Sequence, residues 1–238
     1  IIFRGCHTDA IYGHSAGLRF DKSDHLTIRN SEFYDNDNGL TGLGENTLVE
    51  YSEIYNNGDL AASSTLGSSN IYIFGGGSFT LRYSYIHDSR VSQNFHIRSS
   101  NATLEYNWIA RARSYEGDLM TTGTGAGPVA PLQTMTLRGN VIIGRSPDQY
   151  PTASNVIQIL DDKSGHNSYK IIALWNTFIV NSGNNPNVIY IHNDGLTNAE
   201  VLMANNIIVG TKYAYDVKSP NTQNWLIYGS NNWMETGA

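Results

Sequence analysis

The chain repeats one short pattern from end to end, and this repeat limits the folds open to it more than any other feature. Each copy has apolar residues two apart, then a small polar residue, then another apolar residue, as in residues 26–33, 79–86 and 135–142. The small polar residue recurs at positions 6, 31, 52, 84, 107, 140, 176, 206 and 232. A repeat of this length is typical of stacked structural units that bury one continuous core.

The alternation inside each copy has the period of a β-strand with one buried face, and no useful window has the 3.6-residue period of a helix. The shortest spacing, from Ser31 to Ser52, leaves room for three short strands and their turns, so longer spacings predict inserted loops. Residues 1–238 are therefore predicted to form a single all-β domain, a right-handed parallel β-helix of about nine coils.

The repeated Ser and Asn residues are predicted to lie at a tight turn, where they hydrogen-bond to their equivalents in adjacent coils. Cys6 is expected to take this position in the first copy, as a free thiol. Because the sequence opens on Ile1, in what reads as mid-strand, earlier coils and an end cap are expected to be missing. One interior column is predicted, and it consists of Ile28, Val49, Leu81, Leu104, Leu137 and Met203.

A second strand precedes many of these segments by about eight residues. Its apolar residues alternate with others that must point outward if the apolar ones face the core. Arg98 lies one step along the strand from this outward column. The column itself is predicted to contain Arg19, Tyr72, His96, Gln158 and Tyr190.

Composition excludes several partners and linkages. Only 15% of residues are charged and the net charge is −6, which argues against a nucleic-acid-binding surface. No run approaches the roughly 20 apolar residues that a membrane span needs. A single cysteine excludes an internal disulfide and a multi-cysteine zinc site.

Six segments of the sequence resemble a known family: residues 15–19, 26–33, 35–42, 70–73, 94–99 and 115–119. They are similar to motifs of bacterial, mostly uncharacterised right-handed parallel β-helix proteins, which are related in fold to pectate lyases and other polysaccharide lyases. Gln93 stands where that family usually has His, and Arg98 where it usually has Lys. The resemblance implies a secreted or cell-surface bacterial protein whose partner is a polysaccharide.

Cleavage of a uronate polymer by β-elimination needs a cation for the carboxylate, a base for the adjacent proton, and a donor for the leaving oxygen. His96, Arg98 and Asp118 are the candidate catalytic residues, and His96 is the easier base because a guanidinium hardly loses its proton. Asp118, with Glu116 beside it, is expected to bind Ca²⁺ or to orient the base. Asp35, Asp37 and Asp59 are predicted to be turn residues, with calcium ligation as the alternative, and no cofactor other than Ca²⁺ is indicated.

The remaining candidates are substrate-binding residues. Arg19 could clamp a carboxylate, Tyr72 and Tyr190 could stack on sugar rings, and Gln158 and Glu116 extend the surface. Each candidate residue also has a purely structural alternative. For Arg98 and Asp118 it is a salt bridge that links two neighbouring coils. Two functions stay open: a lyase or epimerase acting on acidic polysaccharide, and a non-catalytic glycan-binding or structural β-helix.

Overall fold

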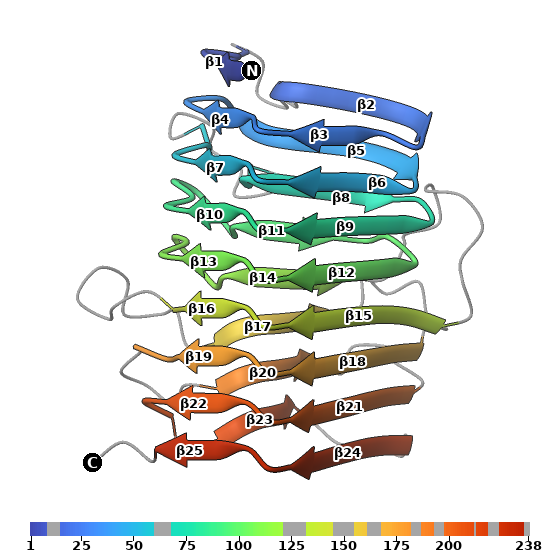
Figure 1. The fold of residues 1–238 in the computed structure, drawn as a ribbon, viewed down its shortest axis with the longest axis vertical. Coiled ribbons are helices and arrows are strands. Elements are labelled where there is room, and N and C mark those ends of the chain that lie inside the picture. The colour runs from blue at the N-terminus through green and yellow to red at the C-terminus, as the bar shows by residue number, and fades with distance from the viewer. Residues whose placement is uncertain are drawn as a thin grey trace.

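The computed structural model describes residues 1–8, 15–59, 68–120, 132–144, 155–160, 168–181, 187–192, 198–211, 213–218 and 224–235. These residues form three entirely parallel sheets that stack as the sides of a right-handed β-helix (Figure 1). We call the three sheets A, B and C and give their strands below; each coil passes through one strand of sheet B, then of sheet C, then of sheet A. Among the described residues, no helix is long and apolar enough to cross a membrane.

The three sheets contain nine, eight and eight described strands. Sheet A consists of β1 (Ile2–Arg4), β4 (Glu32–Tyr34), β7 (Glu53–Tyr55), β10 (Tyr85–His87), β13 (Trp108–Ala110), β16 (Val141–Ile143), β19 (Thr177–Ile179), β22 (Ile207–Val209) and β25 (Trp233–Glu235). Sheet B consists of β2 (Ala16–Asp24), β5 (Asn38–Glu45), β8 (Ile71–Gly75), β11 (Phe95–Ile97), β14 (Gly117–Met120), β17 (Asn155–Leu160), β20 (Asn187–His192) and β23 (Tyr213–Lys218). Sheet C consists of β3 (Thr27–Arg29), β6 (Thr47–Glu50), β9 (Ser78–Arg82), β12 (Asn101–Glu105), β15 (Leu132–Arg138), β18 (Ser168–Leu174), β21 (Asn198–Ala204) and β24 (Asn224–Ser230).

The core runs along the axis between the sheets, and the predicted interior column is confirmed. Its six residues are all buried and follow one another in the register of sheet C, with Ala173 between Leu137 and Met203. Each inward side chain packs on its equivalents one coil above and below. Removing apolar surface from water at every coil is the main stabilising contribution to such a solenoid.

The predicted ladder of Ser and Asn side chains is also confirmed, at the turn from sheet C to sheet A. Asn107 is representative: its backbone N–H and its Nδ2 donate to Asn140 Oδ1 at 2.9 and 3.0 Å. Its Nδ2 also donates to the Leu81 carbonyl at 2.9 Å. The ladder continues through Asn176 and Asn206 to Asn232. Because these amides are buried, leaving one unpaired would cost about 1–3 kcal/mol.

Cys6 is a free thiol, but its expected place in this ladder is wrong. Strand β1 pairs with β4 so that Ile2 faces Glu32, which puts Ile1 rather than Cys6 level with Ser31. The backbone N–H of Cys6 donates instead to Asn36 Oδ1, at 3.0 Å. Cys6 therefore lies at the next turn of the coil, after sheet A.

Candidate functional site

The outward-facing side chains of sheet B form one continuous column across eight strands. Strand pairing brings together all five residues expected in this column and adds Asp118 beside His96. In order along the axis the column contains Arg19, Thr41, Tyr72, His96, Asp118, Gln158, Tyr190 and Asp216. Neighbours in such a column are one strand spacing apart, about 4.8 Å. We call this set the sheet B column.

At the centre of the column, three charged or titratable side chains form a hydrogen-bonded chain. Arg98 Nε donates to His96 Nε2 at 3.1 Å, and His96 Nδ1 lies 3.2 Å from Asp118 Oδ2. Because Nε2 accepts from Arg98, the proton of the neutral ring lies on Nδ1 and faces the carboxylate. The carboxylate therefore fixes the ring orientation, and the lone pair of Nε2 is held in the hydrogen bond from Arg98.

The carboxyl group of Asp118 is almost completely buried, with 2% of the residue exposed. Its Oδ2 also accepts from Gln93 Nε2 at 3.0 Å and from the Tyr115 hydroxyl at 3.4 Å. Among the described residues, no group hydrogen-bonds to Oδ1, although this atom is buried too. A buried carboxylate oxygen without a hydrogen bond is energetically costly. Oδ1 can therefore accept a hydrogen bond that no neighbouring group in the described part of the sheet supplies.

Two residues that the sequence interpretation left without a role hold Asp118 in place. The Gln93 side-chain oxygen accepts from the hydroxyls of Ser69 and Ser92, which turns its amide nitrogen toward Tyr115 and Asp118. Burial, and then the negative charge of Asp118, raise the pKa of Tyr115, so its hydroxyl keeps its proton. Both residues precede strands in turns, where alternation gives no orientation, so only their place in the family motifs could have pointed to them.

Tyr72 packs against the cluster from the coil before. Its ring meets the His96 ring edge-on, with centroids 4.7 Å apart, and contacts Phe74 at 6.0 Å. The imidazole is thus covered on one side, and 14% of the His96 side chain is exposed. Arg98, which bonds to His96 through Nε, contacts the next coil through its Nη2 atom, 3.4 Å from Met120 Sδ.

The other expected residues extend the column away from this cluster. Arg19 is half exposed and lies 3.5 Å from Asp21, two strands away from Tyr72. Gln158 and Tyr190 follow Asp118 on the next two strands in the other direction. Arg19 and Tyr190 are therefore too far from His96 to take part in the same bond-breaking step, and their expected roles are in holding a chain.

Glu116 does not reach this face, contrary to the expectation that it binds substrate. It is fully buried and its Oε2 accepts from Asn94 Nδ2 at 2.6 Å, while both carboxylate oxygens accept from the Ala112 backbone N–H. It ends a second buried ladder at the turn that leads into sheet B. The members of that ladder before it are Asn36, Asn57, Asn70 and Asn94. The sequence signal was present, since Asn70, Asn94 and Glu116 each stand two residues before a member of the sheet B column.

This burial also decides whether the expected calcium ligands fit. Asp118 points outward from sheet B and Glu116 points inward, so the two carboxylates cannot bind one cation together. Across the part of the chain that the structure describes, no group of three or more His, Cys, Asp or Glu side chains is arranged to hold a metal ion. The residues expected to bind Ca²⁺ do not form a site for it.

The stacked parallel coils, the buried polar ladders and the charged outward column together define a right-handed parallel β-helix with one polar cluster on its sheet B face. The chain belongs to the right-handed β-helix family, whose model, described as a right handed beta helix region, matches residues 2–171. No curated protein and no solved structure matches the chain.

Proposed function

We propose that this domain acts on an acidic, uronate-containing polysaccharide, as a lyase or epimerase, and that the sheet B column is its substrate surface. The observation that carries the proposal is the chain of hydrogen bonds from Arg98 through His96 to Asp118. It brings together a cation, an imidazole whose Nε2 lone pair accepts from that cation, and a buried carboxylate, carried by β11, the residue that follows it and the neighbouring strand β14. These are the groups that removal of a proton next to a carboxylate requires.

In the proposed reaction, the sugar carboxylate accepts hydrogen bonds from Arg98, whose guanidinium suits a bidentate contact. As Arg98 turns from His96 to the sugar carboxylate, the lone pair of His96 Nε2 is released and removes the proton from the carbon next to that carboxylate. Asp118 stabilises the resulting imidazolium through Nδ1, as a buried carboxylate does in other acid–base pairs. In a lyase the electron pair forms the new carbon–carbon double bond, the glycosidic carbon–oxygen bond breaks, and the leaving oxygen takes up the proton from the His96 imidazolium. In an epimerase the carbon–oxygen bond stays intact, water delivers a proton to the opposite face of the same carbon, and His96 returns its proton to the solvent.

The rest of the sheet B column supports binding of a polymer rather than a small molecule. Its members come from successive coils at nearly constant spacing, so an extended chain lying along the axis meets several of them at once. We assign Arg19 to a more distant carboxylate, Tyr72 and Tyr190 to the sugar rings, and Gln158 to hydroxyl groups. As part of this proposal, the domain works outside a bacterial cell, where such polysaccharides occur, either secreted or at the surface.

The alternative is a glycan-binding or structural β-helix without catalysis. The limited exposure of His96 and the burial of Asp118 favour this alternative, because a buried, paired group can have a purely structural role. In that function the cluster stabilises the coil. In a glycan-binding β-helix the polar residues on either side of the cluster form the binding surface, and in a structural β-helix they bind no glycan.

The two functions separate in one experiment. The chain is incubated with a panel of uronate polysaccharides, and the ultraviolet absorbance of the unsaturated product is recorded, with proton exchange next to the carboxylate as the readout for epimerisation. The proposal predicts product with at least one polymer and none with neutral polysaccharides. If neither signal arises with any uronate polymer while the protein is folded, the catalytic proposal is wrong and the binding or structural function stands.

A further inference from the structure

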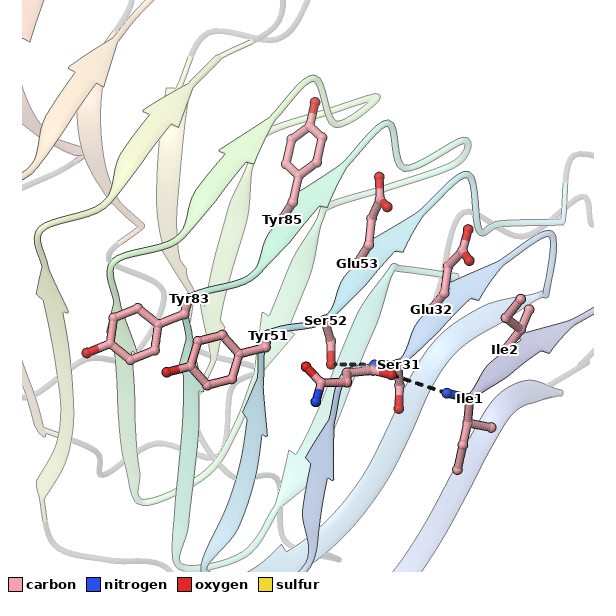
Figure 2. Close-up of a pocket in the computed structure, with 10 residues that line it drawn as sticks. Ile1, Ile2, Ser31, Glu32, Tyr51, Ser52, Glu53, Tyr83 and Tyr85 are labelled. Atoms are coloured by element: carbon pink, nitrogen blue, oxygen red, sulfur yellow. Dashed lines mark hydrogen bonds between the residues drawn. The ribbon is translucent and has the colours of Figure 1, made fainter.

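An open depression of about 540 Å³ lies on a different side of the β-helix, where the turn from sheet C meets the outer face of sheet A. Figure 2 shows its two sides: the rings of Tyr51 and Tyr83 on one, and Glu32, Glu53 and Tyr85 on the other, with Ser31 and Ser52 between them. Its volume falls within the range of small-molecule sites. None of these residues belongs to the sheet B column.

The aromatic side of the depression is one end of a stack. Tyr51 and Tyr83 lie with ring centroids 5.2 Å apart, and Tyr83 and Tyr106 with centroids 5.5 Å apart, all nearly parallel. Each residue has a positive φ near 50°, which turns its side chain out of the coil. In the preceding coil Asn30 takes the equivalent position. The stack therefore ends at Tyr51, which is 53% exposed and lines the depression together with Tyr83.

The acidic side is held in a fixed geometry. Glu32 and Glu53 are neighbours in the register of sheet A. Glu32 Oε1 accepts from the Tyr55 hydroxyl at 2.7 Å, a bond that raises the pKa of Tyr55 to about 12, so the donor keeps its proton. Glu53 Oε1 lies 3.0 Å from His87 Nε2. Each carboxylate is thus oriented through Oε1, and Oε2 is the atom that a ligand hydroxyl would contact.

We propose that this depression is a second carbohydrate site that binds a neutral sugar. A tyrosine face offers rigid apolar area for the C–H face of a sugar ring at little entropic cost. Pre-oriented carboxylates accept hydrogen bonds from sugar hydroxyls, and bonds to a charged acceptor are the stronger kind. Two carboxylates and one cation, the α-ammonium of Ile1 that donates to the Asn30 carbonyl, line the depression, so its net charge is negative and disfavours a uronate. The sheet B column and this depression therefore select sugars of different charge.

The test is calorimetric titration of the whole chain with neutral tetrasaccharides of glucose, xylose, mannose and N-acetylglucosamine, and with a uronate tetrasaccharide in an arm of its own. At least one neutral sugar should bind, and Tyr51→Ala should weaken its binding about tenfold. The double variant Glu32→Gln/Glu53→Gln should weaken it several-fold. Trp175→Ala is the matched control, because Trp175 is an exposed aromatic residue at the same turn position, away from the depression. Its variant should bind like the unmodified chain.

Three outcomes would overturn the proposal: no neutral sugar binds at millimolar concentration, Tyr51→Ala binds unchanged, or Trp175→Ala loses as much affinity as Tyr51→Ala. Binding of amine-bearing oligosaccharides alone, abolished by high salt, would also overturn it, since it would mark a cation site. A His96→Gln variant should keep its affinity for the neutral sugar. This keeps the result independent of whether the sheet B column is catalytic.

Discussion

Two walls of the same β-helix carry charged columns, and they differ in how those charges are paired. On sheet C, arginine and glutamate alternate from coil to coil in what we call the arginine–glutamate ladder: Arg29, Glu50, Arg82, Glu105 and Arg138. Glu50 is buried and accepts from both Arg29 and Arg82, the latter at 2.7 Å, and Glu105 pairs with Arg138 at 3.1 Å. On sheet B, Asp118 shares one oxygen among three donors and leaves the other unused.

The difference shows which charged column is structural. Alternating unlike charges at one strand spacing pair with one another along the arginine–glutamate ladder, and its buried atom without a hydrogen bond among the described residues, Arg138 Nε, lies at the end of the ladder. In the sheet B cluster, by contrast, an imidazole nitrogen that can take up a proton accepts from Arg98, and Asp118 Oδ1 accepts no hydrogen bond from the described residues. We therefore assign stability to the ladder and chemistry to the sheet B column, and the following variants test that division.

The largest effect is expected from the sheet B cluster. His96→Gln and Arg98→Gln should each lower turnover of a uronate polymer by at least about 100-fold, because each removes a group that touches the reacting sugar. Glutamine at position 96 can still donate to Asp118, so the melting temperature should hold. The comparison variant is Glu105→Gln, which should leave turnover unchanged. Activity and stability falling together in the His96 and Arg98 variants would assign these residues to the wall.

Glu50→Gln should give the opposite result. Removing the buried carboxylate leaves Arg29 and Arg82 without their shared partner, so the melting temperature should fall by several degrees while turnover per folded molecule stays the same. Thermal unfolding and an initial-rate assay on the same preparation measure both. A Glu50→Gln variant with unchanged melting and reduced turnover would reverse the assignment of the two walls.

Tyr115→Phe tests the support of Asp118 and should have a moderate effect. It deletes the hydroxyl that hydrogen-bonds with Gln93 and Asp118, without opening a cavity. Turnover should fall up to about tenfold, with a displaced pH–rate profile, because Asp118 then stabilises the imidazolium differently. A change in affinity alone, with the pH profile intact, would show that Tyr115 only shapes the surface.

The smallest effect concerns acid stability. Hydrogen bonds from Arg82 and Arg29, with the charges of both, hold the pKa of Glu50 below its ordinary value, against the opposing effect of burial. The folded chain thus binds fewer protons here than the unfolded chain. This contribution is complete above the unfolded pKa of glutamate and is lost as pH falls through the lower folded value. Denaturant unfolding between about pH 7 and about pH 3 should therefore show a shallower loss of stability in Glu50→Gln than in the unmodified chain.

How far the sequence predicts this molecule depends on whether a residue lies in a strand or in a turn. In strands, alternation decides which face a side chain takes, so the interior column and the order of Tyr72, His96 and Gln158 could be predicted. In turns it decides nothing. Glu116 stands two residues from Asp118 yet points to the opposite side of the wall, because its backbone belongs to the turn and its carboxylate replaces an asparagine of the second ladder.

The same reason explains Cys6 and the two residues that support Asp118. The small polar turn residue marks two different turns of the coil, and in residues 1–8 the sequence does not tell them apart, so the repeat alone predicts the wrong turn for Cys6. Gln93 and Tyr115 approach Asp118 only because two turns of different composition meet beside it. Such contacts between coils depend on the stacking register and the turn conformation together.

The most direct measurement is a crystal structure of the His96→Gln variant with a bound uronate oligosaccharide. Both walls carry arginines, so an acidic glycan could lie on either, and its position decides between them. The division proposed here predicts a chain along the sheet B column, with one carboxylate on Arg98 and a sugar ring beside Tyr72. A glycan bound across Arg29, Arg82 and Arg138 instead would contradict it.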